Sequence, residues 1–118
     1  MVVQDLGGFK ERFASVEGLG RDQIASEMAR GLAEAGHDVS KVRARIYLDE
    51  VLRVIQTVLE SGKHVELRGF GSFYPLRRGV RRIYSPLAKK AIRVDARWIV
   101  RFDTSKILKR RLMETLEG

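Results

Sequence analysis

The sequence predicts an α+β fold with N-terminal helices, a three-stranded antiparallel sheet with a long protruding β-hairpin arm, and a short C-terminal helix. Three observations lead to this prediction. Apolar residues recur at helical spacing up to residue 61, and they alternate with charged residues from residue 91. Glycine, aromatic residues and arginine dominate the stretch between. Helical periodicity followed by strand periodicity within 118 residues is typical of one α+β domain.

Three helices are expected in the first half of the chain. Residues 5–17 place apolar side chains at helical spacing and predict a short amphipathic helix. Asp22 is the expected N-cap of a second helix, which Gly36 ends. Ser40 is the expected N-cap of a longer third helix that runs through Ser61. The apolar stripe of this helix is wider than one helical partner would cover, so a sheet or a second subunit should pack there.

Two strands are expected around a glycine-rich reversal. Gly69 and Gly71 flank Phe70 and are expected to supply the backbone freedom of a tight turn. Pro75 in the returning strand predicts an edge position or a bulge, because proline cannot donate to the ladder.

A third strand is expected from Ala91 to Phe102, where an apolar face alternates with a face that is largely cationic and includes Ile99. Thr104 or Ser105 should then cap the last helix, which carries leucines at four-residue spacing.

A second subunit is expected to complete the core. Phe70, Phe73, Trp98 and Phe102 present more aromatic surface than one small sheet face can bury. An obligate dimer would supply the missing layer.

The net charge of +8 is concentrated in one part of the chain. Residues 1–76 carry 10 basic and 11 acidic side chains, whereas residues 77–118 carry 13 basic and 4 acidic ones. The expected arm holds only one acidic residue, Asp95, against eight basic residues: Arg77, Arg78, Arg81, Arg82, Lys89, Lys90, Arg93 and Arg97. Such a segregated positive surface indicates a polyanionic partner, either nucleic acid or an anionic membrane surface.

Several classes of function are disfavoured. Without cysteine, the chain has no disulfide, thiolate metal site or cysteine nucleophile. Two isolated histidines are poor metal ligands, and Asp49 and Glu50 are adjacent on a helix and point to different sides, so we expect neither a metal site, a cofactor nor catalysis. No apolar run is long enough for a membrane span, and residues 1–8 do not resemble a signal peptide. We therefore expect an intracellular protein.

Several motifs resemble the bacterial histone-like HU and integration host factor family of DNA-bending proteins. They are Ser40-Lys41, the segment Gly62-Lys63-His64-Val65-Glu66-Leu67-Arg68-Gly69-Phe70-Gly71-Ser72-Phe73, Pro86, Phe102, Lys106 and Leu108-Lys109. The resemblance covers about residues 22–116. It implies a family-like domain over residues 22–118, with an arm at about 75–97, preceded by an extension over residues 1–21.

The resemblance also implies a mechanism. Two chains would form an intertwined homodimer with Phe70, Phe73 and Phe102 in its core, and its arms would enter the DNA minor groove. Pro86, helped by Leu87, would partly unstack one base step and kink the duplex. The residues implied to contact DNA are Arg68, Arg77, Arg78, Arg81, Arg82, Pro86, Lys89, Lys90, Arg93, Arg97, Lys106 and Lys109. The expected function is largely sequence-independent bending or compaction of double-stranded DNA by a cytoplasmic, nucleoid-associated protein.

Some alternatives remain open. Arg68 is either a phosphate contact or a surface strand residue. The arm tip, residues 85–90, lacks the glycine usual in the family, so its turn is expected to differ in type or to be mobile. The N-terminal extension is either an added packing element or a partner-binding segment. A sequence-preferring bending factor of the integration host factor kind is one alternative function. A dimeric interaction module that binds an acidic protein or an anionic surface is the other.

Overall fold

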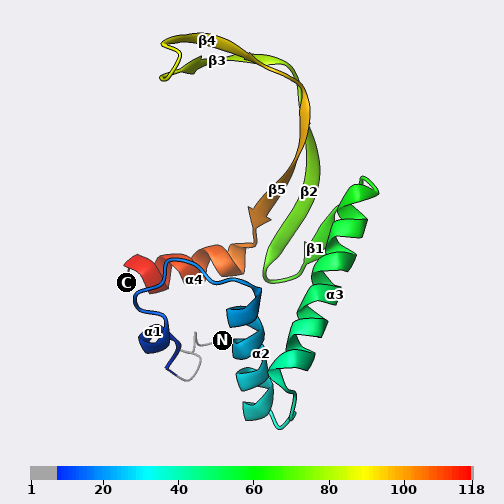
Figure 1. Cartoon of the computed structure of the whole chain (residues 1–118), viewed down its shortest axis with the longest axis vertical. Coiled ribbons are helices and arrows are strands. Elements are labelled where there is room, and N and C mark those ends of the chain that lie inside the picture. Colours follow the sequence, from blue (N-terminus) through cyan, green and yellow to red (C-terminus); the bar gives the residue numbers. More distant parts are fainter. Residues whose placement is uncertain (1–7, 118) are drawn as a thin grey trace. The chain divides into compact units, whose positions relative to one another are not determined.

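The element order of the computed structural model is α1–α2–α3–β1–β2–β3–β4–β5–α4, and the structure describes residues 8–117 (Figure 1). The chain separates into two compact units, residues 1–54 and residues 55–118. Helices dominate the first unit, while the second holds an antiparallel sheet, a two-stranded ribbon and the C-terminal helix. The predicted α+β class is therefore confirmed. No helix within residues 8–117 is long and apolar enough to cross a membrane.

The predicted helix over residues 5–17 is much shorter in the structure. The helix α1 contains only Phe9–Arg12, and the predicted start at Asp5 lies outside the described residues. The Val16 N–H donates to the Phe13 carbonyl, three residues back, at 3.0 Å. The chain therefore leaves the helix in a tight turn, because a second helical turn is not completed.

Residue Arg12 of α1 anchors this segment to α2, Arg21–Glu34. Its Nε and Nη2 donate to the two carboxylate oxygens of Glu27 at 3.1 Å and 2.6 Å. The Glu27 side chain is only 10% exposed. The rings of Phe9 and Phe13 pack against each other with centroids 4.9 Å apart, and the Arg12 guanidinium carbon lies 5.9 Å from the Phe13 ring centroid. A bidentate, largely covered ion pair favours the role of the extension as an added packing element.

The start of α2 differs from the prediction. Asp22 is not the N-cap; Gly20 takes that position, and its N–H donates to the Gln23 side chain at 3.0 Å. The carboxylate of Asp22 instead forms an ion pair with Arg45. An ion pair with a neighbouring helix competes with capping for the same oxygens, and this competition cannot be read from local sequence.

The helix α3, Lys41–Glu60, begins as predicted and ends one residue before the predicted Ser61. The Ser40 Oγ accepts a hydrogen bond from the Arg43 N–H at 3.1 Å, and Gly62 follows the helix with φ of +77°. Arg45 and Asp49 form an i,i+4 ion pair on this helix at 3.1 Å. The hydrogen bond from Arg45 lowers the pKa of the Asp49 carboxyl below its ordinary value. The carboxylate therefore stays ionised beside its partner.

The second unit contains a three-stranded sheet of order β1–β2–β5, formed by Val65–Leu67, Gly71–Arg78 and Arg97–Thr104. The helix α4, Lys106–Glu117, follows β5. The last residue of β2 that pairs with β1 is Phe73, opposite Val65, so β2 has only β5 beside it from Tyr74 onward. Pro75 therefore lies where one side of β2 is an edge, as predicted.

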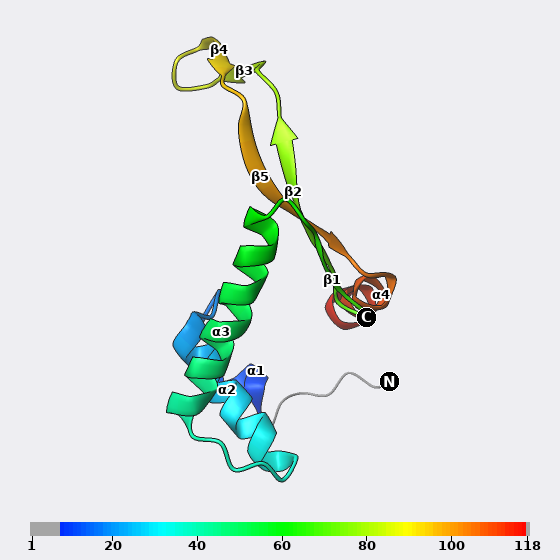
Figure 2. The same cartoon turned by 90° about the vertical axis from the view of Figure 1, so that its right-hand side faces the viewer.

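The predicted continuous strand from Ala91 to Phe102 is interrupted. It consists of β4, Lys90–Val94, and β5, with Asp95 and Ala96 between them. The facing strand breaks between β2 and β3, Arg81–Ser85, at Gly79 and Val80. Glycine, aspartate and alanine are weak strand formers, and the ribbon bends where they interrupt the two strands (Figure 1; Figure 2 gives the view at 90°).

The register does not change across this bend. Arg78 pairs with Arg97 before it, and Arg81 pairs with Val94 after it. Two residues therefore separate the ladders on each strand, and no residue is inserted as a bulge. The arm is one two-stranded ribbon, which the sequence predicted over about residues 75–97.

Very few large side chains are buried in one protomer. Among residues 8–117, the only fully buried apolar residues are Ala25 and Ala44. The α3 side chains Val42 and Ile46 are 72% and 58% exposed, and Trp98 of β5 is 64% exposed. A chain of this length would not be stable with such an interior alone, so these surfaces need a cover.

Candidate nucleic-acid interface

The reversal at the base of the interface uses its two glycines differently. The Phe70 N–H donates to the Leu67 carbonyl at 2.9 Å, and Gly69 has φ of +83°. Gly69 thus supplies the left-handed conformation that this turn requires. Gly71 does not have a positive φ; a Cβ at this position would lie 2.5 Å from both the Asp103 carbonyl oxygen and Phe102 Cζ. The prediction that both glycines provide turn freedom is wrong for Gly71, which permits close packing instead.

An aromatic cluster packs beside Gly71. The ring centroids of Phe73 and Phe102 are 4.6 Å apart, and those of Phe70 and Phe102 are 5.3 Å apart. Phe70 remains 42% exposed and Phe102 36% exposed in the protomer. The structure brings together the three residues predicted for the dimer core and leaves them partly open to a partner.

A surface hollow lies between Arg68 and the start of α4. The Ser105 N–H donates to the Phe70 carbonyl at 2.9 Å, and the Ser105 Oγ accepts from the Leu108 N–H at 3.1 Å. Ser105, not Thr104, is therefore the N-cap of α4. The hollow has a volume of about 480 Å³ and is lined by residues that include Arg68, Ser72 and Ser105. Lys106 and Lys109 lie in the first turn of α4, which follows Ser105 in the chain.

Each ladder of the arm contains two arginines directly opposite each other. Arg78 faces Arg97 in the β2–β5 ladder, and Arg82 faces Arg93 in the β3–β4 ladder. Like charges in directly opposed positions are destabilising. Within residues 8–117, the only acidic partner of an arm cation is Asp95, which lies 3.6 Å from Arg93 at a well exposed position. The arm is thus held with unneutralised positive charge on both strands.

The tip of the arm closes without glycine. Pro86, Leu87, Ala88 and Lys89 connect β3 to β4, and Lys89 takes the left-handed conformation with φ of 55°. The Ser85 carbonyl accepts from the Lys89 N–H at 2.8 Å, and the Ser85 Oγ accepts from the Ala88 N–H at 3.2 Å. Glycine would adopt this left-handed conformation without strain, but the tip contains none. For Lys89 the conformation costs about 1–2 kcal/mol. Of the two alternatives expected for the tip, the structure supports a turn that differs in type from the glycine-containing turn usual in the family.

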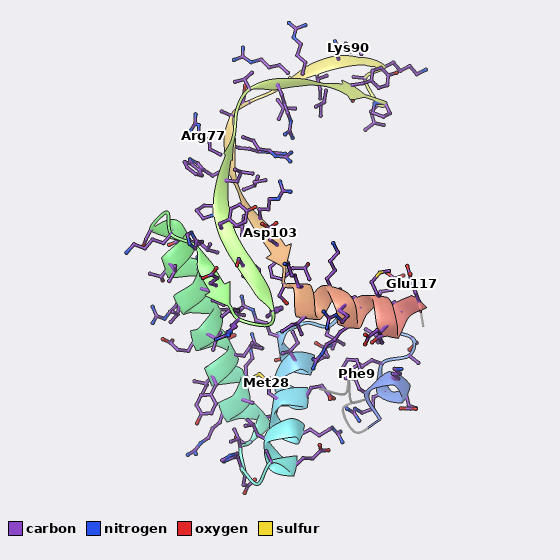
Figure 3. All side chains as sticks on the ribbon, turned by 180° about the vertical axis from the view of Figure 1, so that it is seen from behind. Phe9, Met28, Arg77, Lys90, Asp103 and Glu117 are labelled. Atoms are coloured by element: carbon purple, nitrogen blue, oxygen red, sulfur yellow. The ribbon has the colours of Figure 1, made fainter. Side chains whose placement is uncertain are left out.

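All of the predicted DNA-contacting residues lie in the second unit. Arg68 is in the turn before β2, and Lys106 and Lys109 are on α4. Figure 3 shows Arg77 along the ribbon, Lys90 near its far end, and Asp103 where the ribbon reaches α4. The others lie on the arm: Arg78, Arg81, Arg82, Pro86, Lys89, Arg93 and Arg97.

One cation of this surface was not singled out from the sequence as a DNA contact. Arg101 faces Tyr74 on β2 and adds a cation at the base of the arm. The Tyr74 hydroxyl donates to Asp103 at 2.9 Å, and this bond raises the pKa of the Tyr74 phenol. Leu87, at the tip, is 99% exposed. The cationic alternation of residues 93–101 was a signal for Arg101, whereas the exposure of Leu87 required the loop geometry.

No group of three or more histidine, cysteine, aspartate or glutamate side chains suited to a metal ion occurs in the described part of the chain. The interface is built from cations, aromatic rings and apolar side chains. Binding through charge and shape is the chemistry that such a surface supports.

Comparisons with known proteins point to one family. The family model described as "Bacterial DNA-binding protein" matches residues 23–113. Integration host factor subunit beta of Mannheimia succiniciproducens is 32% identical over 87 residues, which cover 74% of this chain and 93% of that protein. DNA-binding protein HU-beta of Serratia marcescens is 39% identical over 75 residues, or 64% of this chain and 83% of that protein.

The fold is similar to that of an Anabaena HU protein crystallised with DNA. The TM-score is 0.67 at 23% sequence identity, and the match covers 80% of this chain and 97% of the Anabaena chain. At this identity, the similarity supports the fold.

A small α+β unit with a two-stranded, arginine-rich arm defines a class of DNA-binding protein. The chain belongs to the bacterial DNA-binding protein family, and the resemblance to HU and integration host factor is thereby confirmed. The predicted class of function, a DNA-binding architectural protein, is confirmed with it. The family is one of DNA-binding proteins rather than of enzymes, and dimer formation is typical of it.

Proposed function

We propose that this protein is a homodimer that bends and compacts double-stranded DNA in the bacterial nucleoid, largely independently of sequence. The observation that carries the proposal is the pair of opposed arginines in each ladder of the arm, Arg78–Arg97 and Arg82–Arg93. Phosphates on both sides of a groove would relieve the repulsion that these pairs create. This geometry suits a polyanion that carries phosphates along both edges of a groove, as double-stranded DNA does.

The width of the arm connects binding to bending. Two strands lie about 4.8 Å apart before their side chains are counted, whereas the minor groove of undistorted B-DNA is only about 6 Å wide. An arm of this kind therefore requires a widened groove. Widening accompanies bending toward the major groove, and its free-energy cost is offset by additional protein contacts along the bent duplex.

Association of two chains would cover the open apolar surfaces. The proposed dimer core contains Phe70, Phe73 and Phe102, which are in mutual contact but incompletely covered in one protomer. We expect light scattering to give a mass twice the 13.4 kDa of the chain at micromolar concentration. A stable, folded monomer at the same concentration would contradict the homodimer.

Pro86 is the proposed wedge between base pairs. It is exposed in the tip loop, and as a proline it has no backbone N–H to satisfy. We expect Pro86→Ala to reduce the DNA bend, measured by energy transfer between dyes at the two ends of a short duplex. Binding should weaken by about tenfold, because less unstacked surface is covered. The salt dependence of binding should not change, because no charge is removed.

The control for this variant is Val80→Ala, which removes an exposed apolar side chain of the arm away from the tip. A Pro86→Ala protein that bends DNA as the unmodified protein does would refute the wedge but leave DNA binding intact. Competition between random and selected duplexes would distinguish sequence-independent binding from the integration-host-factor-like alternative. A protein that fails to shift duplex DNA at moderate salt would instead favour the interaction-module alternative.

A further inference from the structure

The tip of the arm presents a second apolar side chain next to Pro86. Leu87 is 99% exposed, more than any other large apolar residue described within 8–117. An isolated exposed leucine is common, but this one occupies the far end of a strongly cationic ribbon. Solvent provides no favourable environment for an apolar side chain of this size.

We propose that Leu87 is a second intercalating residue, which inserts with Pro86 so that the two form one wedge in the minor groove. The proposal rests on the proposed function, because it concerns the same arm and the same DNA. Leucine and proline are both among the side chains that unstack base pairs from the minor groove. Two adjacent apolar residues would separate more base surface than proline alone, and the base pairs would cover the leucine.

The loop is arranged to hold this side chain outward. Two hydrogen bonds to Ser85, from Lys89 at 2.8 Å and from Ala88 at 3.2 Å, fix the backbone on either side of Leu87. The left-handed Lys89 then returns the chain into β4. A loop that is already ordered loses little conformational entropy when it inserts, so the contact of Leu87 with the bases contributes more fully to affinity.

The charges near the tip would position the wedge. Lys89 and Lys90 follow Leu87 directly, and Arg82 and Arg93 form the opposed pair behind it on the ribbon. These cations can hold the phosphates that flank one base step while the apolar pair enters it. The cations contribute the salt-dependent part of binding, whereas the proposed role of Leu87 is independent of salt.

The test uses the full-length protein and a short duplex that carries a base analogue whose fluorescence rises when it is unstacked. We expect Leu87→Ala to lower this signal and the bend together, and to weaken binding about five- to tenfold. The slope of affinity against salt should stay as it is. Leu87→Met should keep most of the signal because it is also an apolar wedge residue, and Val80→Ala should keep all of it.

The outcomes separate this inference from the proposed function. If Pro86→Ala loses the bend but Leu87→Ala does not, the second wedge residue is refuted and the bending function stands. If Leu87→Ala weakens binding without lowering the unstacking signal, Leu87 contacts DNA outside the base stack and the inference is wrong. If the unmodified protein itself does not bend duplex DNA, the proposed function fails and the inference fails with it. Because Leu87 is fully exposed, its truncation is expected to leave the circular dichroism spectrum unchanged.

Discussion

Removal of both opposed arginine pairs, by R78A/R97A together with R82A/R93A, is expected to abolish tight DNA binding. Each neutralised phosphate contributes about 0.9 to the slope of log affinity against log salt. The variant loses four arginine–phosphate contacts per protomer, which should reduce that slope by roughly 3 to 4 for each arm engaged. The affinity for duplex DNA near 0.1 M salt should fall by about three orders of magnitude. The measurement is a titration of labelled duplex at several salt concentrations.

The control for this prediction removes charge elsewhere. Arg30 and Arg43 lie on the helices of the first unit, so R30A/R43A lowers the net charge as much as R82A/R93A does. We expect the R30A/R43A protein to keep nearly the full salt slope and R82A/R93A to lose a substantial part of it. Equal effects of the two variants would mean that overall charge, not the arm, determines binding.

Gly71→Ala is expected to have the largest effect on folding. The added Cβ would lie 2.5 Å from the backbone carbonyl oxygen of Asp103, and backbone cannot move aside as a flexible side chain can. The pairing of Gly71 with Thr104 and the hydrogen bond from Ser105 to Phe70 hold that backbone in place. We expect a loss of about 3 kcal/mol or more in the free energy of unfolding, measured by urea denaturation, or failure to fold.

Two other glycines make this prediction specific. Gly69→Ala is strained only by its φ of +83°, so a smaller loss of about 1 kcal/mol is expected. Gly31 lies within α2 with nothing within 4 Å of an added Cβ, so Gly31→Ala should stabilise the protein by up to about 1 kcal/mol. Equal losses at all three positions would refute the close-packing role of Gly71.

The features that could be predicted from the sequence depend on local chemistry. Ser40 and Gly62 delimit α3 because capping and left-handed glycine act within a few residues. The cations of the arm could be identified because Asp95 is the only acidic residue among these eight basic residues. The pairing that places Arg78 opposite Arg97 and Arg82 opposite Arg93 follows from the register, which the structure supplies.

The features that could not be predicted depend on contacts between distant residues. Asp22 is an ion-pair partner of Arg45 rather than a cap because α3 approaches it. Gly71 resembles Gly69 in sequence, and only the position of Phe102 and Asp103 reveals its different role. The break of the ribbon at Gly79 and Asp95 arises because weak strand formers occur at the same level of both strands.

The end-to-end distance of a dye-labelled duplex, measured with and without the protein over a range of salt, tests the central claim most directly. We expect the ends to approach each other when the protein binds, with two chains per complex. Binding should also weaken steeply as salt rises, if the arms bend DNA as proposed. Binding that leaves the ends at the distance of straight DNA, or no binding at moderate salt, would contradict this claim.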